Sequence, residues 1–218
     1  MRPAIGWPIA VLFGLLSVIA FANGEALNEW VRENAIVIDS DDEATLVGIT
    51  ENEKWFVVLI DFPDQNENSN CNQQRASNLL DDSAKDHIRQ AFGESISLEI
   101  DYHDEIITTG SPLADYGHDI DWEKDVGKNG VNPHILAQEI ATKIKGEVSD
   151  WSKYDLNDDG WVDRFLILHC TKPQEDGGGA NSRIWSHFSS TEEVVDLPGD
   201  MKISHYTIAS QYSSNNFG

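Results

Sequence analysis

The chain has 218 residues, enough for one substantial domain, and hydrophobic residues make up 40% of it, enough to build a core. Its 38 acidic and 15 basic residues give a formal net charge of -23. Phosphate binding needs clustered Lys and Arg, so this balance argues against a nucleic-acid partner and against an anionic membrane surface. The acidic residues are spread along the chain, which is typical of a heavily solvated surface and leaves cation binding open for a few of them.

The N-terminal segment is almost wholly apolar over residues 4–22 and follows a single charge at Arg2. It closes on Ala20-Phe21-Ala22, a small-x-small pattern that a signal peptidase accepts. We therefore predict a signal peptide over residues 1–22 and a secreted protein. The run is also about long enough to stay as an N-terminal membrane anchor, with the rest of the chain facing outside.

Residues 23–53 form an acidic lead-in that we interpret as either edge strands, at residues 35–38 and 46–49, or a propeptide remnant. The body of the protein is expected over residues 54–218. It opens with an unbroken apolar run at residues 55–60, which predicts a strand buried on both faces.

Two helices and three further strands are predicted along the body. Apolar residues at helical spacing (Leu80, Ala84, Ile88 and Phe92) predict a helix over residues 75–92 that ends at Gly93. Alternation predicts a half-buried strand over residues 95–102, and a long loop follows at 109–132.

The second helix opens at Asn132-Pro133, with Asn as its N-cap and Pro in its first turn. Its expected buried stripe is Ile135, Leu136, Ile140, Ile144 and Val148. Apolar strands are predicted at residues 164–169 and 201–210. This alternation indicates an α/β protein, with α+β still open, in which two long helices flank a mixed, largely buried sheet.

The strongest local motif is the segment of residues 155–163, DLNDDGWVD. Its side-chain oxygens at loop positions 1, 3, 5 and 9, with Gly160 at position 6, can wrap a hard cation such as Ca²⁺. The predicted ligands are Asp155, Asn157, Asp159, the Trp161 carbonyl and Asp163. Position 12 is Leu166 instead of Glu, so this is no EF-hand, and a turn that binds no ion is the alternative.

The two cysteines, Cys71 and Cys170, are an even pair in a chain that we expect to be exported. A disulfide between them and two unpaired thiols are both compatible with the sequence.

No catalytic motif is complete in this sequence. The seven histidines form no H-E-x-x-H pattern, and no G-x-S-x-G elbow or phosphate-binding Gly-rich loop occurs. His169, His187 and His205 could converge in space as a zinc cluster, although a lone histidine is far more often a satisfied polar residue. We therefore expect no catalytic residue within this chain.

Several segments, taken in order, resemble the immune-inhibitor-A-like secreted zinc metallopeptidases. Residues 54–64 (KWFVVLIDFPD) are similar to the first core strand of that family, and residues 110–117 (GSPLADYG) to its substrate-side loop. Residues 154–163 resemble its YDxDxDGxxD segment. Residues 184–187 (IWSH) and 206–210 (YTIAS) match the pieces that precede its zinc helix.

This resemblance implies a zincin-like N-terminal subdomain of a zinc endopeptidase that acts on protein or peptide substrates. The next element of the family is a helix carrying H-E-x-x-H, in which two histidines hold Zn²⁺ and the glutamate activates water. None of those residues maps onto this chain, so we expect it to be a truncated part of a longer peptidase that stops before the zinc helix, and we expect the fragment alone to be inactive. The alternative is a non-catalytic, calcium-stabilised extracellular binding or adhesion module.

Overall fold

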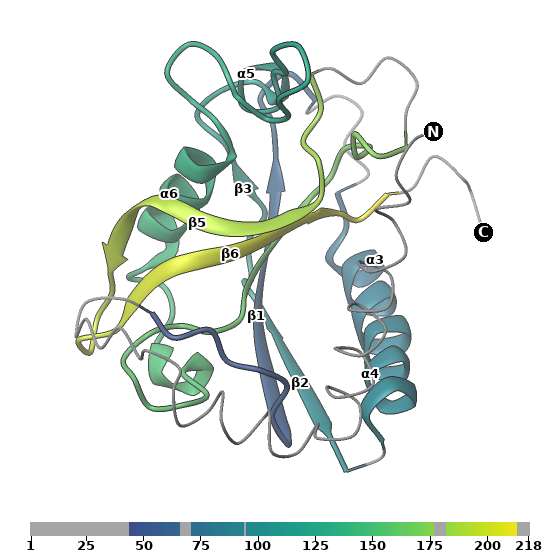
Figure 1. Ribbon diagram of the computed structural model, residues 1–218, viewed down its shortest axis with the longest axis vertical. Coiled ribbons are helices and arrows are strands. Elements are labelled where there is room, and N and C mark those ends of the chain that lie inside the picture. Colours follow the sequence, from purple (N-terminus) through teal and green to yellow (C-terminus); the bar gives the residue numbers. More distant parts are fainter. Residues whose placement is uncertain (1–43, 66–70, 94, 177–181, 213–218) are drawn as a thin grey trace, which may run out of the picture. The chain divides into compact units, whose positions relative to one another are not determined.

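A six-stranded mixed sheet is the centre of the protein in this computed structural model, which describes residues 44–65, 71–93, 95–176 and 182–212 (Figure 1). Its strands are β1 (Asn52–Asp61), β2 (Ser97–Tyr102), β3 (Ile107–Thr108), β4 (Phe165–His169), β5 (His187–Asp196) and β6 (Lys202–Ser210). They lie in the order β2-β1-β4-β6-β5, and β3 pairs with the end of β1. All neighbours are parallel except β5, which runs antiparallel to β6.

The two central strands are the apolar runs that the sequence predicted. Every residue of β4 is buried, as are the last six residues of β1. Their alternate side chains enter two separate clusters, since successive residues of a strand point to opposite faces of the sheet. The predicted burial on both faces is therefore confirmed, and so is the α/β class in the sense of a mixed sheet with helices on its faces.

One face of the sheet is covered by the helical segment α3 (Gln73–Ser77), η2 (Asn78–Ala84) and α4 (Lys85–Phe92). Asn72 caps its start by accepting from the backbone N–H of Gln74 at 2.8 Å. Leu80 and Ile88 are buried as predicted, but Phe92 is 53% exposed, so its place in the buried stripe was wrong. The seven residues of η2 have π-type turns, which shift the phase of the stripe between Leu80 and the end of α4.

The other face is covered by α6 (Pro133–Ile144), with α5 (Leu113–Tyr116) and the 3₁₀ turn η3 (Trp151–Tyr154) beside it. Asn132 is the N-cap as predicted, and its side chain accepts from the N–H of Ile135 at 3.0 Å. Leu136, Ile140 and Ile144 are fully buried. Val148 lies beyond the end of the helix, although it still packs against the same cluster.

The structure differs from the sequence-based expectations at two places, and two further expectations concern residues that the structure does not describe. Residues 46–49 form no strand; Leu46 is 67% exposed, and the backbone becomes regular only at Asn52. The strand β5 was not predicted. The predicted signal segment, residues 1–22, and the apolar piece at 35–38 lie outside the described residues. Within the described part of the chain, no helix is long and apolar enough to cross a membrane.

Candidate functional site

The acidic loop, residues 155–163, joins η3 to β4 and is closed by its own carboxylates. Asp155 accepts backbone N–H donors on both oxygens, from Asp159 at 3.1 Å and from Gly160 at 2.8 Å. Asp159 Oδ1 accepts from the N–H of Trp161 at 3.0 Å. Gly160 has φ +86°, a left-handed conformation that an L side chain rarely adopts. The sharp turn predicted from the motif is therefore present.

The other two predicted ligands lie in the same loop. Asn157 donates from Nδ2 to Asp159 Oδ2 at 2.8 Å and accepts from the Asp159 N–H at 3.2 Å. Asp163 Oδ2 accepts from the N–H of Leu156 at 2.6 Å. Burial raises the pKa of Asp163 to about 6, and the neighbouring carboxylates of Asp159 and Asp155 add to this rise.

The loop gathers the oxygen ligands that Ca²⁺ prefers, but in this structure its carboxylates accept N–H groups, mostly of the loop itself and in one case of Thr45. Among the described residues, no group of three acidic, His or Cys side chains is placed to hold a metal ion. Calcium at this loop therefore stays a prediction.

An ion pair ties the strand after the loop to the start of the domain. Glu53 is fully buried, and Arg164 donates to it from Nε at 2.9 Å and from Nη2 at 3.2 Å. The same guanidinium donates to the carbonyls of Val47 and Gly48 at 3.1 and 2.8 Å. Residues 47 and 48 are thus held against β4 without forming a strand.

The three histidines that could have formed a zinc cluster lie in different surroundings. His169 is fully buried and contacts Thr171 Oγ1 at 2.8 Å, and burial lowers its pKa to about 4. His187 contacts the hydroxyl of Tyr206 at 2.9 Å, whereas His205 stacks on Phe188. These three side chains therefore make no common site in this structure.

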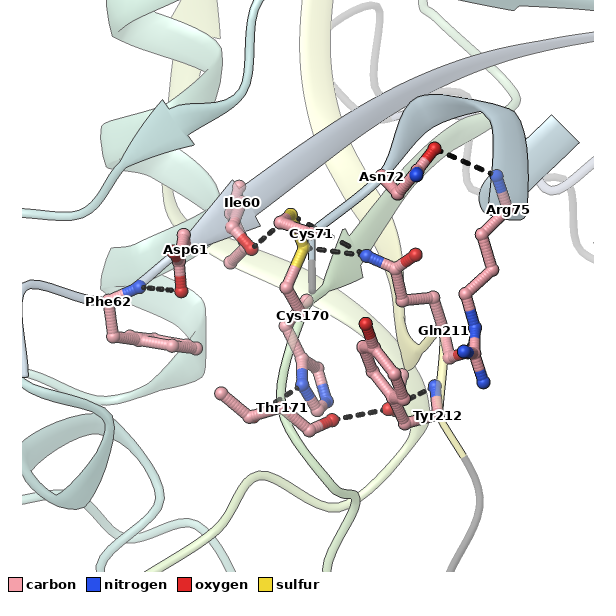
Figure 2. The surroundings of a disulfide bond; sticks show 12 residues. Ile60, Asp61, Phe62, Cys71, Asn72, Arg75, Cys170, Thr171, Gln211 and Tyr212 are labelled. Atoms are coloured by element: carbon pink, nitrogen blue, oxygen red, sulfur yellow. Dashed lines mark hydrogen bonds between the residues drawn. A yellow bond between two sulfur atoms is a disulfide. The ribbon is translucent and has the colours of Figure 1, made fainter. Parts of the chain in front are cut away.

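Cys71 and Cys170 are joined by a disulfide (Figure 2). The bond connects the residue before the α3 N-cap to the first residue after β4, so it ties a covering helix to the centre of the sheet. Gln211, just after β6, donates from Nε2 to Cys170 Sγ at 2.7 Å. Of the two possibilities left by the sequence, the structure has the bonded one.

The feature that the sequence did not reveal is the antiparallel edge strand β5. Its only strand partner in the described sheet is β6. On its other side, α6 supplies two side-chain contacts: His134 Nδ1 lies 2.7 Å from the Ser190 carbonyl, and Gln138 accepts from the N–H of Glu193 at 3.2 Å. Among the described residues, no side chain makes a hydrogen bond to the backbone of residues 187–189, so an extended chain could pair along this part of the strand.

No protein-family model matches this chain, and neither does any curated protein. Its function is therefore inferred from its own residues and from the resemblance that its motifs carry.

Proposed function

We propose that this chain is the N-terminal part of a secreted zinc-dependent endopeptidase of the immune-inhibitor-A-like kind, and that it supplies the scaffold and substrate-side surface of a zincin-like domain. Support comes from where the family-like segments fall. Residues 54–64 belong mostly to β1, residues 154–163 lead directly into β4, and residues 206–210 end β6. Segments far apart in the sequence thus belong to three neighbouring strands.

The observation that carries the proposal is the arrangement of β5 beside β6. The parallel strands β1, β4 and β6 end at the same edge of the sheet, and β5 starts there, because His187 pairs with Ile208 near the end of β6. In the resembled family the zinc helix follows the segment that matches the end of β6. The zinc helix would therefore continue from the edge of the sheet at which β5 begins. A polypeptide paired with the first residues of β5 would pass along this same edge.

Among the described residues, no three His, Cys, Asp or Glu side chains are placed to hold a metal ion together. The zinc ligands are expected on the helix that follows in the family, where the metal would supply an activated water for peptide-bond hydrolysis. The role left to this chain is to bind and orient the substrate backbone. Export of the protein is supported by the apolar segment at residues 1–22, and a disulfide suits an oxidising compartment.

The test is proteolysis by the longest secreted product that contains this chain. Cleavage of an unfolded protein substrate should be abolished by a zinc chelator and restored by added Zn²⁺. Cleavage that is insensitive to the chelator, or no cleavage by a product that carries an intact H-E-x-x-H, would overturn the proposal.

The second candidate is a calcium-stabilised extracellular binding module, favoured by the acidic loop at residues 155–163. Burial raises the pKa of Asp163 in this loop, and the carboxylates of Asp159 and Asp155 act in the same direction, so a bound cation would be favoured there. This candidate predicts that calcium raises the melting temperature of a secreted product that cleaves no protein substrate. Chelator-sensitive proteolysis would remove it.

A further inference from the structure

A cavity of about 250 Å³ opens between the start of α6, the first residues of β5 and the loop that precedes α6. The cavity is lined by residues of that loop, of α6 and of β5: Lys124, Asp125, Pro133, His134, Trp185, His187 and Ser189. His187 and Ser189 are alternate residues of the edge strand, so they point to the same side of it. The cavity therefore lies beside the stretch of β5 that is open to an extended chain.

The inner wall of the cavity carries an acceptor that the described residues leave unused. The Asp125 side chain is 9% exposed. Its Oδ2 accepts from the N–H of Trp185 at 3.0 Å and lies 3.6 Å from His187 Nδ1. Its Oδ1 is buried without a hydrogen-bond partner in the described structure. The terminal torsion of Asp is broad, so a small rotation can turn Oδ1 toward a ligand in the cavity.

The charges around Asp125 favour a cation. The pKa of Asp125 is raised to about 7, mainly by burial, and the carboxylates of Asp119 and Glu175 act in the same direction. The hydrogen bond from the Trp185 N–H and the charge of Lys124 act in the opposite direction. Lys124 is already paired, because its Nζ lies 2.8 Å from Asp119 Oδ2. The carboxyl groups of Asp119, Asp125 and Glu175 thus lie near a single lysine, whose charge is already paired. A bound positive charge would reduce the repulsion among the three carboxylates.

The cation that fits this cavity is organic rather than a metal ion. Both ring nitrogens of His187 are engaged, with the Trp185 carbonyl at 2.7 Å and the Tyr206 hydroxyl at 2.9 Å. Nδ1 of His134 contacts the Ser190 carbonyl. These contacts leave too few free donors for a metal. The indole of Trp185 is 42% exposed, and its face can attract an ammonium or guanidinium group.

We propose that this cavity binds the charged end of one Lys or Arg side chain from a polypeptide that pairs with β5, with Asp125 as its counter-ion. This inference rests on the proposed function, because it adds a basic-residue preference to the same substrate surface. An alkyl-ammonium or alkyl-guanidinium side chain would enter between Trp185 and His187 while the peptide backbone follows the strand edge. Neutral and acidic side chains would leave Asp125 without its partner.

The test uses the chain itself and a blocked pentapeptide with central Arg, compared with the same peptide carrying citrulline, which keeps the shape and removes the charge. Binding is followed by tryptophan fluorescence and by calorimetry in two buffers of different ionisation enthalpy. We expect the Arg peptide to bind at least about tenfold more tightly, as one charge-assisted hydrogen bond allows. At pH 7 its binding should release a proton, because a cation favours the carboxylate form of Asp125.

The variant D125N should lower the affinity for the Arg peptide to that for the citrulline peptide and abolish proton release. The matched control is D121N, an exposed aspartate of the same loop, which should change neither. If D125N folds poorly, the variant W185L, at a partly exposed position, provides a second test. It should lower the affinity for the Arg peptide more than that for the citrulline peptide.

Equal affinity for the two peptides, or Arg binding that survives in D125N, would overturn the inference. So would binding of Zn²⁺ alone that D125N removes, since the cavity would then be a metal site. These measurements need no peptidase activity. If the Arg peptide does not bind as expected, the zinc-peptidase proposal is unaffected. If proteolysis proves insensitive to the chelator, the peptide-binding result is unaffected.

Discussion

The substitution E53Q should destabilise the protein strongly, although it keeps the size of the side chain. The Glu53 carboxylate is fully buried and accepts from Arg164, from the N–H of Thr50 at 2.8 Å and from Trp55 Nε1 at 3.0 Å. Glutamine removes the negative charge. Its NH₂ group would also face N–H donors, from which it cannot accept a hydrogen bond. Breaking a buried ion pair by removing one partner typically costs about 3–5 kcal/mol. Arg164 is 21% exposed, so we expect about 3 kcal/mol, the lower end of that range.

A loss of about 3 kcal/mol corresponds to a fall of roughly 6–12 °C in melting temperature for a domain of this size. Urea unfolding at several pH values measures it directly. Burial acts to raise the pKa of Glu53, but the hydrogen bonds from Arg164, Thr50 and Trp55 together outweigh it and leave the pKa below its ordinary value. The Glu53 contribution is therefore present above the ordinary pKa and is lost as pH falls through the lowered one.

The matched control is E51Q, an exposed glutamate two residues away, which should stay within about 0.5 kcal/mol of the wild type. If E53Q stays within that same margin at pH 7, the buried ion pair does not contribute the expected stability. A difference between E53Q and wild type that grows as the pH is lowered below 4 would also contradict the expected contribution.

The other predictions concern the disulfide, the buried Asp125, the acidic loop and the α6 cap. Replacing Cys71 and Cys170 by Ser removes a link across 99 residues and should lower the unfolding free energy by up to about 4–5 kcal/mol, which urea unfolding with and without reductant would check. Because burial raises the pKa of Asp125 to about 7, the wild type should lose stability as pH rises from 4 to 8. The variant D125N should gain up to about 4 kcal/mol of unfolding free energy relative to the wild type over that range. A difference in thermal unfolding between the two proteins that does not change with pH would contradict this. Calcium should raise the melting temperature of the wild type but not that of D159N, as a thermal scan with chelator and then Ca²⁺ would show. N132A should cost about 1 kcal/mol through the lost cap, measured by urea unfolding, with T142A at an exposed position of the same helix as the control.

The elements that the sequence predicted are those whose own residues determine them. β1 and β4 are continuous apolar runs, and α6 has both a cap at Asn132 and a regular buried stripe. The turn at Gly160 followed from the spacing of side-chain oxygens, which is also a local property.

The elements that the sequence missed depend on distant partners. The sequence of β5 is mostly polar and alternates poorly, and the strand is formed by pairing with β6 on one side and by contacts to α6 on the other. Asp125 looks like an ordinary loop carboxylate in the sequence. Its burial comes from Trp185 and His187, about 60 residues further along, so no local pattern could have revealed it.

The coding sequence immediately downstream of codon 218 is the most direct test of the proposal that this chain belongs to a zinc endopeptidase. We expect an open reading frame that encodes H-E-x-x-H within roughly ten to twenty codons, so that the zinc helix follows β6. A stop codon at that position, in an intact gene, would contradict the zinc-endopeptidase assignment and leave the calcium-stabilised binding module in its place.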